Sequence, residues 1–144
     1  MQERFRTFTV YLAKINRNIR RLKAEKMKEF NLKTPHVSCI YYLYREGSLT
    51  AKELCDICEE DKSGVSRSIE QLEKEGYIEC EEKVKKRYKS PLKLTEKGRE
   101  LGKSLADIIE GVLLELSKDV PEEDLKTMYK VLGIISTNLE NKKI

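Results

Sequence analysis

SGVSRSIEQLEKEGYI, residues 63–78, has the pattern of an amphipathic helix with a bare, hydroxyl-rich leading end. At about 100° of rotation per residue, Val65, Ile69 and Leu72 share one apolar stripe, which predicts packing against a core. The opposite, polar stripe consists of Ser63, Arg67, Glu70 and Lys74, with Ser66 at its edge. Such a face meets either a partner or only water, and the surrounding sequence decides between the two.

A second, shorter helix is predicted just before this one. Thr50 with Glu53 three residues later matches a capping box, in which each side chain bonds the backbone N–H of the other residue. Asp61 suits the N-cap of the following helix. The two helices, near residues 51–58 and 62–75, are thus joined by a tight polar turn, as in a helix-turn-helix.

Two short strands are predicted after the second helix. Residues 77–80 have the bulk and β-preference of a strand, and Leu92-Lys93-Leu94 predicts a second one. Between Lys83 and Lys93 the chain carries five lysines and one arginine but no acidic residue. This order is that of a winged helix-turn-helix, in which the second helix enters the major groove of DNA and the hairpin reaches the backbone or minor groove.

The small side chains at the front of the second helix have a use in such a fold. Ser63 and Ser66 allow the helix end to approach phosphates and base edges, and backbone N–H groups at a helix N-terminus attract phosphate. The alternative for Arg67 is an exposed arginine paired along its own helix with Glu70. The surrounding pattern favours DNA contact by Arg67.

Apolar seams at both ends of the chain predict helices that pack against other helices. The seams consist of Phe5, Phe8, Leu12, Ile15, Ile19 and Leu22 at the start, of Leu101, Leu105, Ile108, Val112 and Leu116 after Thr95-Glu96, and of Leu125, Met128, Leu132, Ile135 and Leu139 at the end. Their steps of three and four residues are typical of helix-packing faces. Thr34-Pro35 opens a further helix that Gly47 closes, and Pro121 suits the first position of the last helix. The predicted fold is mainly α with a small β-hairpin wing, a winged helix-turn-helix core flanked by long N- and C-terminal helices.

Length and composition limit the class of protein. The 144 residues suit one domain whose core needs neither disulfide nor metal, and 38% charged with 39% apolar residues at helical spacing predict a helix-rich soluble protein. The net charge of +4 is too small to indicate a nucleic-acid partner, so the local basic stretch carries that argument. No apolar run reaches the roughly 20 residues of a membrane span, so we expect a cytoplasmic protein with no membrane partner and with reduced thiols.

In its motifs the sequence resembles the MarR-type transcriptional regulators. The matching segments are Leu49-Thr50-Ala51-Lys52-Glu53-Leu54, Asp61-Lys62-Ser63-Gly64-Val65-Ser66-Arg67, Leu72-Glu73-Lys74-Glu75-Gly76-Tyr77-Ile78 and Leu94-Thr95-Glu96-Lys97-Gly98. Their order and spacing, flanked by long terminal helices, extend the resemblance over essentially the whole chain. It implies a single MarR-type domain over 1–144. Within it, 1–31 and 96–144 would be mainly dimerisation helices and 35–95 the winged helix-turn-helix lobe, with the motif about 51–75 and the wing about 77–94.

The resemblance also implies a homodimer on double-stranded DNA at a pseudo-palindromic operator, usually a repressor whose affinity a small ligand or an oxidation event lowers. By position, the DNA-contacting residues would be Lys62, Ser63, Ser66 and Arg67 on the second helix and Lys85, Lys86 and Arg87 in the wing. The family wing commonly has an aspartate two residues before its arginine, but Lys86 and Tyr88 fill those two places here. The wing is therefore expected to rely on general phosphate attraction, which depends on salt.

Four cysteines, Cys39, Cys55, Cys58 and Cys80, allow three interpretations. A closed zinc site needs four ligands, whereas the chain offers one CxxC pair and His36 as its one imidazole, so no metal is expected. Oxidation sensing needs an accessible thiol in an electropositive setting, for which Cys39 and Cys55 are the candidates. Structural thiols are the favoured interpretation.

Other functions have less support. The chain has one histidine and no glycine-rich phosphate loop, so neither catalysis nor a bound cofactor is expected. Tyr11, Tyr41, Tyr42 and Tyr44 either line a pocket for a small aromatic ligand or pack in the core. The alternative function is a winged-helix protein-interaction module without specific DNA binding, but the basic wing and the small residues at the helix front favour DNA.

Overall fold

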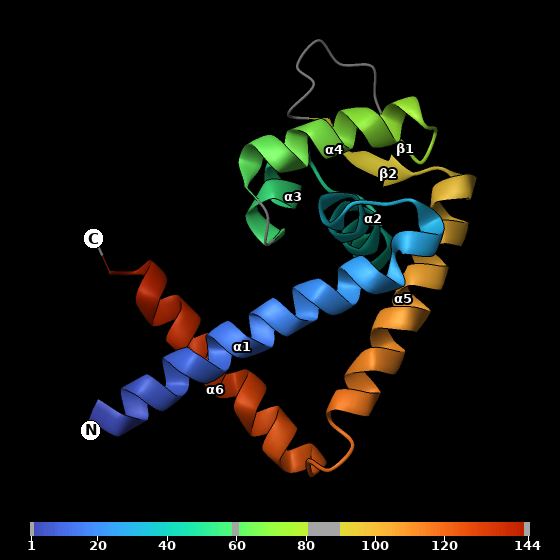
Figure 1. The fold of residues 1–144 in the computed structure, drawn as a ribbon. Helices are drawn as coiled ribbons and strands as arrows, with labels where there is room; N and C mark the ends of the chain where they lie inside the picture. Colours follow the sequence, from blue (N-terminus) through green and yellow to red (C-terminus); the bar gives the residue numbers. More distant parts are fainter. Residues whose placement is uncertain (1, 59–60, 81–89, 143–144) are drawn as a thin grey trace. The chain divides into compact units, whose positions relative to one another are not determined.

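The computed structural model describes residues 2–58, 61–80 and 90–142. The chain divides into one compact unit that ends at Ile108 and a second that begins at Ile109. In chain order the elements are α1 (Gln2–Lys26), the 3-10 helix η1 (Lys28–Phe30), α2 (Thr34–Glu46), α3 (Ala51–Ile57), α4 (Lys62–Lys74), β1 (Ile78–Cys80), β2 (Leu92–Leu94), α5 (Glu96–Leu116) and α6 (Glu122–Glu140), as Figure 1 shows. The predicted fold class, mainly α with a small β-hairpin, is confirmed.

The start and stop signals of the helix-turn-helix lie where the sequence places them. At the start of α3, the Glu53 N–H donates to Thr50 Oγ1 at 3.1 Å and the Thr50 N–H donates to Glu53 Oε2 at 2.8 Å, which completes the capping box. At the start of α4, the Gly64 N–H donates to Asp61 Oδ2 at 3.3 Å. Gly76, just after α4, has a φ of 81°, a left-handed conformation that glycine adopts readily. These local bonds set the limits of both helices.

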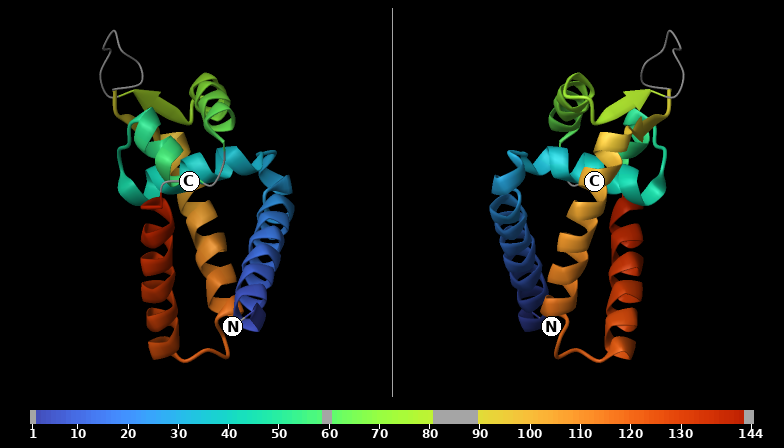
Figure 2. Two further views of the ribbon diagram at one scale, coloured as in Figure 1. Left: turned by 90° about the vertical axis from the view of Figure 1, so that its left-hand side faces the viewer. Right: turned by 90° about the vertical axis from the view of Figure 1, so that its right-hand side faces the viewer.

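The core of the first unit joins α2, α3 and α4 to the hairpin. Its largest fully buried side chains include Met27, Ile40, Leu43, Leu54, Leu72, Leu92 and Leu105. The helix α2 packs against α4, α3 and β2, and α5 adds Leu105 from its first half. Figure 2 shows α4 and the hairpin at one end of the first unit and the N-terminus of α1 at the other.

The two strands form the base of the predicted wing. They pair antiparallel, with Ile78 opposite Leu94. Leu49, before α3, pairs with the other edge of β2, because the Leu92 N–H donates to the Leu49 carbonyl at 2.7 Å and the Leu49 N–H donates back at 3.1 Å. Pro91, which has no N–H to donate, stands just before this strand, where it removes no hydrogen bond of the ladder.

Hydrogen bonds fasten the end of α4 to the start of α5. Thr95 Oγ1 donates to the carbonyl oxygen of Gly76 at 2.6 Å, and Lys97 Nζ donates to that of Glu75 at 2.9 Å. We call these two bonds, together with the packing of Lys97 and Gly98 on Tyr77, the α4–α5 clamp.

Close packing completes the clamp. Lys97 Nζ lies 4.2 Å from the centroid of the Tyr77 ring, within the range of a cation–π interaction. Gly98 passes so close to the turn that an added β-carbon would overlap the carbonyl oxygen of Tyr77. Only glycine therefore fits at the start of α5 without moving the turn after α4.

Two local features differ from the prediction. The sequence pattern did not indicate η1, which ends at Asn31 with a φ of 54° and follows Met27, a residue only 1% exposed. Pro121 is the N-cap of α6 rather than its first helical residue, and the helix begins at Glu122.

The second unit comprises the end of α5 and the whole of α6. Apolar side chains are exposed along both, among them Leu114 at 74%, Leu116 at 61% and Leu139 at 59%. In the first unit, α1 likewise exposes Phe5 at 70% and Ile15 at 53%. Of the helices in the described part of the chain, none combines the length and the hydropathy that a membrane crossing requires.

Candidate nucleic-acid interface

The helix α4 has one buried face and one exposed polar face. Val65, Ile69 and Leu72 are 0%, 7% and 0% exposed. The residues predicted to contact DNA from this helix, Lys62, Ser63, Ser66 and Arg67, are all exposed. The structure therefore brings these four side chains together on the first two turns of α4.

Arg67 is not paired along its own helix. Among the described residues, no ion pair joins its guanidinium to Glu70, the acid that the alternative interpretation requires. Further along α4, Gln71 Nε2 donates to Glu75 Oε1 at 2.6 Å. The guanidinium is thus available for a partner outside the chain.

The predicted wing residues Lys85, Lys86 and Arg87 fall within 81–89 and lie outside the described residues. Of the basic stretch, the structure describes Lys93 on β2. Lys93 Nζ lies 3.7 Å from Glu79 Oε1 across the hairpin, and the two side chains are 42% and 52% exposed. A pair this exposed stabilises the hairpin little, but it gives Lys93 an acidic neighbour.

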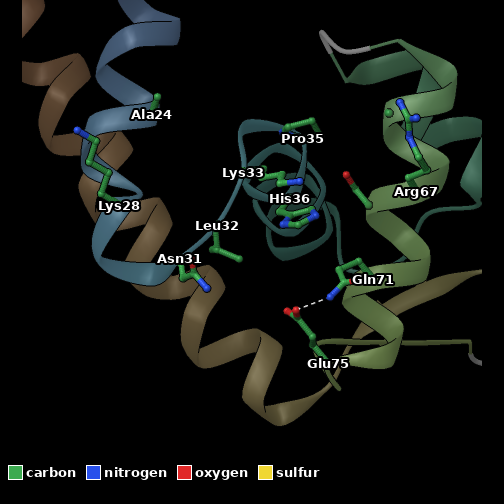
Figure 3. A pocket seen from close by; sticks show the side chains of 12 residues that line it. Ala24, Lys28, Asn31, Leu32, Lys33, Pro35, His36, Arg67, Gln71 and Glu75 are labelled. Carbon is green, nitrogen blue, oxygen red and sulfur yellow. Dashed lines mark hydrogen bonds between the residues drawn. The ribbon is translucent and has the colours of Figure 1, made fainter.

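A recess of about 810 Å³ lies beside α4 within the first unit. Gly64, Arg67, Ser68, Gln71 and Glu75 form its wall on α4. The facing wall comes from the end of α1, η1 and the start of α2, and includes Lys28, Lys33 and His36 (Figure 3). The α4 residues are three or four positions apart, which places them on one flank of the helix. Arg67 belongs both to the predicted DNA-contacting face and to this recess.

The sequence pattern does not predict this recess. Its two walls are separated in sequence by the rest of α2 and the whole of α3, and η1, which carries Lys28, has no clear sequence signal. One signal was available, because Gly64, Ser68, Gln71 and Glu75 repeat at helical spacing without a large apolar residue. Such a flank does not pack tightly against its neighbour.

The side chain of His36 is half-buried at the recess. Burial lowers the pKa of His36, and the positive charge of Lys33 acts in the same direction, while the carboxylate of Glu75 opposes both. The ring is therefore neutral at pH 7.

None of the four cysteines, all of which lie within the described residues, forms a disulfide. A hydrogen bond with Cys58, followed by burial, raises the pKa of Cys39, and burial raises the pKa of Cys55. Within residues 2–58, 61–80 and 90–142, no three His, Cys, Asp or Glu side chains come together as a metal site. The two candidate redox thiols are thus protonated at neutral pH, which disfavours rapid oxidation.

The four tyrosines considered for a ligand pocket have different surroundings. Tyr42 and Tyr44 are half-buried and pack against the core. Tyr41 meets Tyr42 edge to face, with ring centroids 5.4 Å apart, whereas Tyr11 is 59% exposed on α1. Packing accounts for Tyr42 and Tyr44, as the core interpretation predicts.

A short helix, a turn, a second helix with an exposed polar front and a two-stranded hairpin define a winged helix-turn-helix protein. Residues 30–87 match the sequence model of the MarR family. Over this segment the chain is similar to the MarR family, and its fold is that of a winged-helix protein. No curated protein matches the sequence.

Solved structures with this fold extend the similarity to nearly the whole chain. A MarR family transcriptional regulator from Silicibacter pomeroyi is 24% identical, with a TM-score of 0.81 over 94% of this chain and 91% of that one. A MarR family regulator from Neisseria meningitidis is 21% identical, with a TM-score of 0.77 over 93% and 94%. S. aureus MepR in its DNA-binding conformation is 18% identical, with a TM-score of 0.80 over 92% and 98%. At these identities the comparison establishes the fold.

Proposed function

We propose that this protein is a sequence-specific DNA-binding transcriptional regulator. The observation that carries the proposal is the exposed front of α4, where Ser63, Ser66 and Arg67 face outward while Val65 and Ile69 hold the helix on the core. Small side chains let a helix end approach DNA closely, and an arginine can bond a guanine edge with two hydrogen bonds. The MarR-family match and the fold shared with MepR in its DNA-binding conformation support the proposal.

In this proposal the protein acts as a homodimer. Residues 1–31 and 96–144 would supply the dimer interface, and the exposed apolar side chains of α1, α5 and α6 support this, since they would be buried between two copies. Two recognition helices related by a two-fold axis read a pseudo-palindromic operator with half-sites about 34 Å apart. Sedimentation should therefore give a dimer at micromolar concentration, and a stable monomer there would reject this part of the proposal.

The proposed dimer represses transcription in the cytoplasm, and a small ligand lowers its affinity for the operator. A ligand that favours a different separation of the two α4 helices would lower operator affinity, because the helices would no longer match the spacing of the half-sites. Oxidation has less support as the signal, since the pKa values of the Cys39 and Cys55 thiols are raised.

The test is a fluorescence-anisotropy titration with an operator recovered from fragments of the source genome and with a random duplex. Arg67→Ala should lose roughly 1 to 3 kcal/mol of discrimination between the two duplexes, the value of a good base contact. The matched control is Arg99→Ala, which removes an exposed arginine from α5 and should leave both affinities unchanged. If Arg67→Ala bound the operator like the parent protein across a salt series, the front of α4 would not be the reading surface.

The same titration separates the proposal from its alternative. A winged-helix module that binds only proteins should not associate with random duplex at either low or moderate salt. A DNA-binding protein should bind it at low salt and release it as salt rises, because phosphate contacts release counterions.

A further inference from the structure

We infer that the recess beside α4 is a second DNA-backbone contact, in which Lys28 and Lys33 bind phosphates of one strand while the front of α4 occupies the major groove. The inference rests on the proposed function. It extends the DNA-contacting surface to the end of α1 and the start of α2, outside both the helix-turn-helix and the wing.

The dimensions of helix and groove lead to this arrangement. An α-helix with its side chains is roughly 10 to 12 Å across, and the major groove of B-DNA is about 12 Å wide. A helix in the groove therefore has a phosphate strand along each of its flanks. One flank of α4, with Gly64, Arg67 and Gln71, is a wall of the recess, so the strand on that side would run beside it (Figure 3).

The wall that faces this flank is basic. Lys28 and Lys33 are exposed, and neither forms an ion pair with another described residue. Together with Arg67 they place three cations around the recess against one carboxylate, that of Glu75. In Figure 3, Glu75 lies at the opposite end of the α4 wall from Arg67. The recess is thus positive even while His36 is neutral.

Further cations make an extended partner a better fit than an isolated ion. An adjoining recess of about 460 Å³ shares Leu32, Lys33 and Pro35 with the first and adds Arg20 to its lining. The second half of α1 also carries Arg17, Arg21, Lys23 and Lys26. A run of cations of this length attracts a polymer of phosphates, which carries one charge per roughly 3.4 Å of each strand.

The one histidine of the chain provides a reporter inside the recess. The charged groups around the ring are Lys28, Lys33, Arg67 and Glu75. A phosphate placed among them favours the imidazolium form, so bound DNA should raise the pKa of His36. With a single histidine, its ring signals in an NMR spectrum need no assignment.

The test uses the full chain with the recovered operator and a random duplex. The variants are Lys28→Gln, Lys33→Gln and the double variant. The matched control is Lys103→Gln, which removes an exposed lysine of α5 that lines neither recess and lies outside the apolar seam of that helix. We expect the double variant to bind both duplexes about tenfold or more weakly at low salt. The slope of log K against log salt should become shallower by about 0.9 for each phosphate that the variant no longer neutralises. Lys103→Gln should keep the parent affinity and slope.

Two readouts separate the possible failures. If the parent protein bound no duplex, the proposed function would fail and the inference with it. If the parent bound and Arg67→Ala weakened operator binding, but the double variant kept the parent's affinity and salt slope, the inference alone would be overturned. Operator DNA should shift the His36 signal and raise its pKa. A shift with inorganic phosphate at equal ionic strength but none with operator would assign the recess to a free oxyanion and overturn the inference.

Discussion

At the scale of single residues, the proposed DNA contact uses side chains that have no partner within the described residues. Arg67 has no acid paired to it among the described residues, whereas Gln71 and Glu75 on the same helix bond each other. Ser63 and Ser66 add no bulk beside Arg67, so a groove edge can approach the backbone of α4. In the proposed complex, a short part of α4 reads DNA directly and the lysines around it provide general attraction to phosphate.

The half-buried imidazole of His36 should make folding stability depend on pH. Because its pKa is lower in the folded than in the unfolded chain, the unfolded chain binds the proton first as pH falls, and stability should decline from about pH 6.5 down to the folded pKa. When the free energy of unfolding is measured with denaturant between pH 7.5 and 5.5, the His36→Gln variant should lack the part of the decline that His36 causes. The same decline in parent and variant would contradict this role of His36 in stability.

DNA affinity should change in the opposite direction and rise as pH falls, since a phosphate at the recess favours the protonated ring.

At the scale of elements, the α4–α5 clamp ties α4 to the helix that enters the second unit. Thr95 and Lys97 bond carbonyl oxygens at the turn after α4, and Gly98 packs on the same turn. A displacement of α5 at this point therefore acts on the end of α4. This connection is the element through which a ligand elsewhere in the proposed dimer would change the position of α4.

Gly98→Ala tests the clamp. The added methyl group overlaps the Tyr77 carbonyl oxygen, a backbone atom, so overpacking should lower the free energy of unfolding by about 1 to 3 kcal/mol. Gly111→Ala is the matched control in the same helix, because its methyl group meets nothing within 4 Å and alanine is the better helix former by about 1 kcal/mol. Chemical denaturation of both variants should shift their midpoints in opposite directions. Equal midpoints would mean that the turn after α4 moves to accommodate the methyl group without loss of stability.

The elements were largely predictable from sequence because their signals are local. The capping box of Thr50 and Glu53, the N-cap Asp61 and the turn residue Gly76 each act within about one helical turn. The apolar stripe of α4 repeats at the helical period. The recess was not predictable, since Lys28 and His36 approach α4 only through the tertiary packing of α2 on α4. The burial of Met27 and the left-handed Asn31 likewise depend on how the chain turns between α1 and α2.

At the scale of the whole molecule, charge and apolar surface have separate locations along the chain. Basic side chains concentrate in the second half of α1 and in the stretch from Lys83 to Lys93, while α6 begins with the acidic run Glu122, Glu123 and Asp124. Exposed apolar side chains lie on α1 between Phe5 and Ile15 and on α5 and α6. This separation suits a protein that binds DNA through one set of surfaces and a second copy of itself through another.

Selection of duplexes from a randomised pool by the full chain, followed by sequencing, is the most direct test of sequence-specific DNA binding. We expect enrichment of one pseudo-palindrome whose half-sites are separated by one turn of the duplex, about 10 base pairs, and weaker enrichment by Arg67→Ala. A pool that stays random after repeated rounds with the parent protein would contradict sequence-specific DNA binding. Enrichment of single, unrepeated half-sites would contradict the two-fold arrangement of the α4 helices.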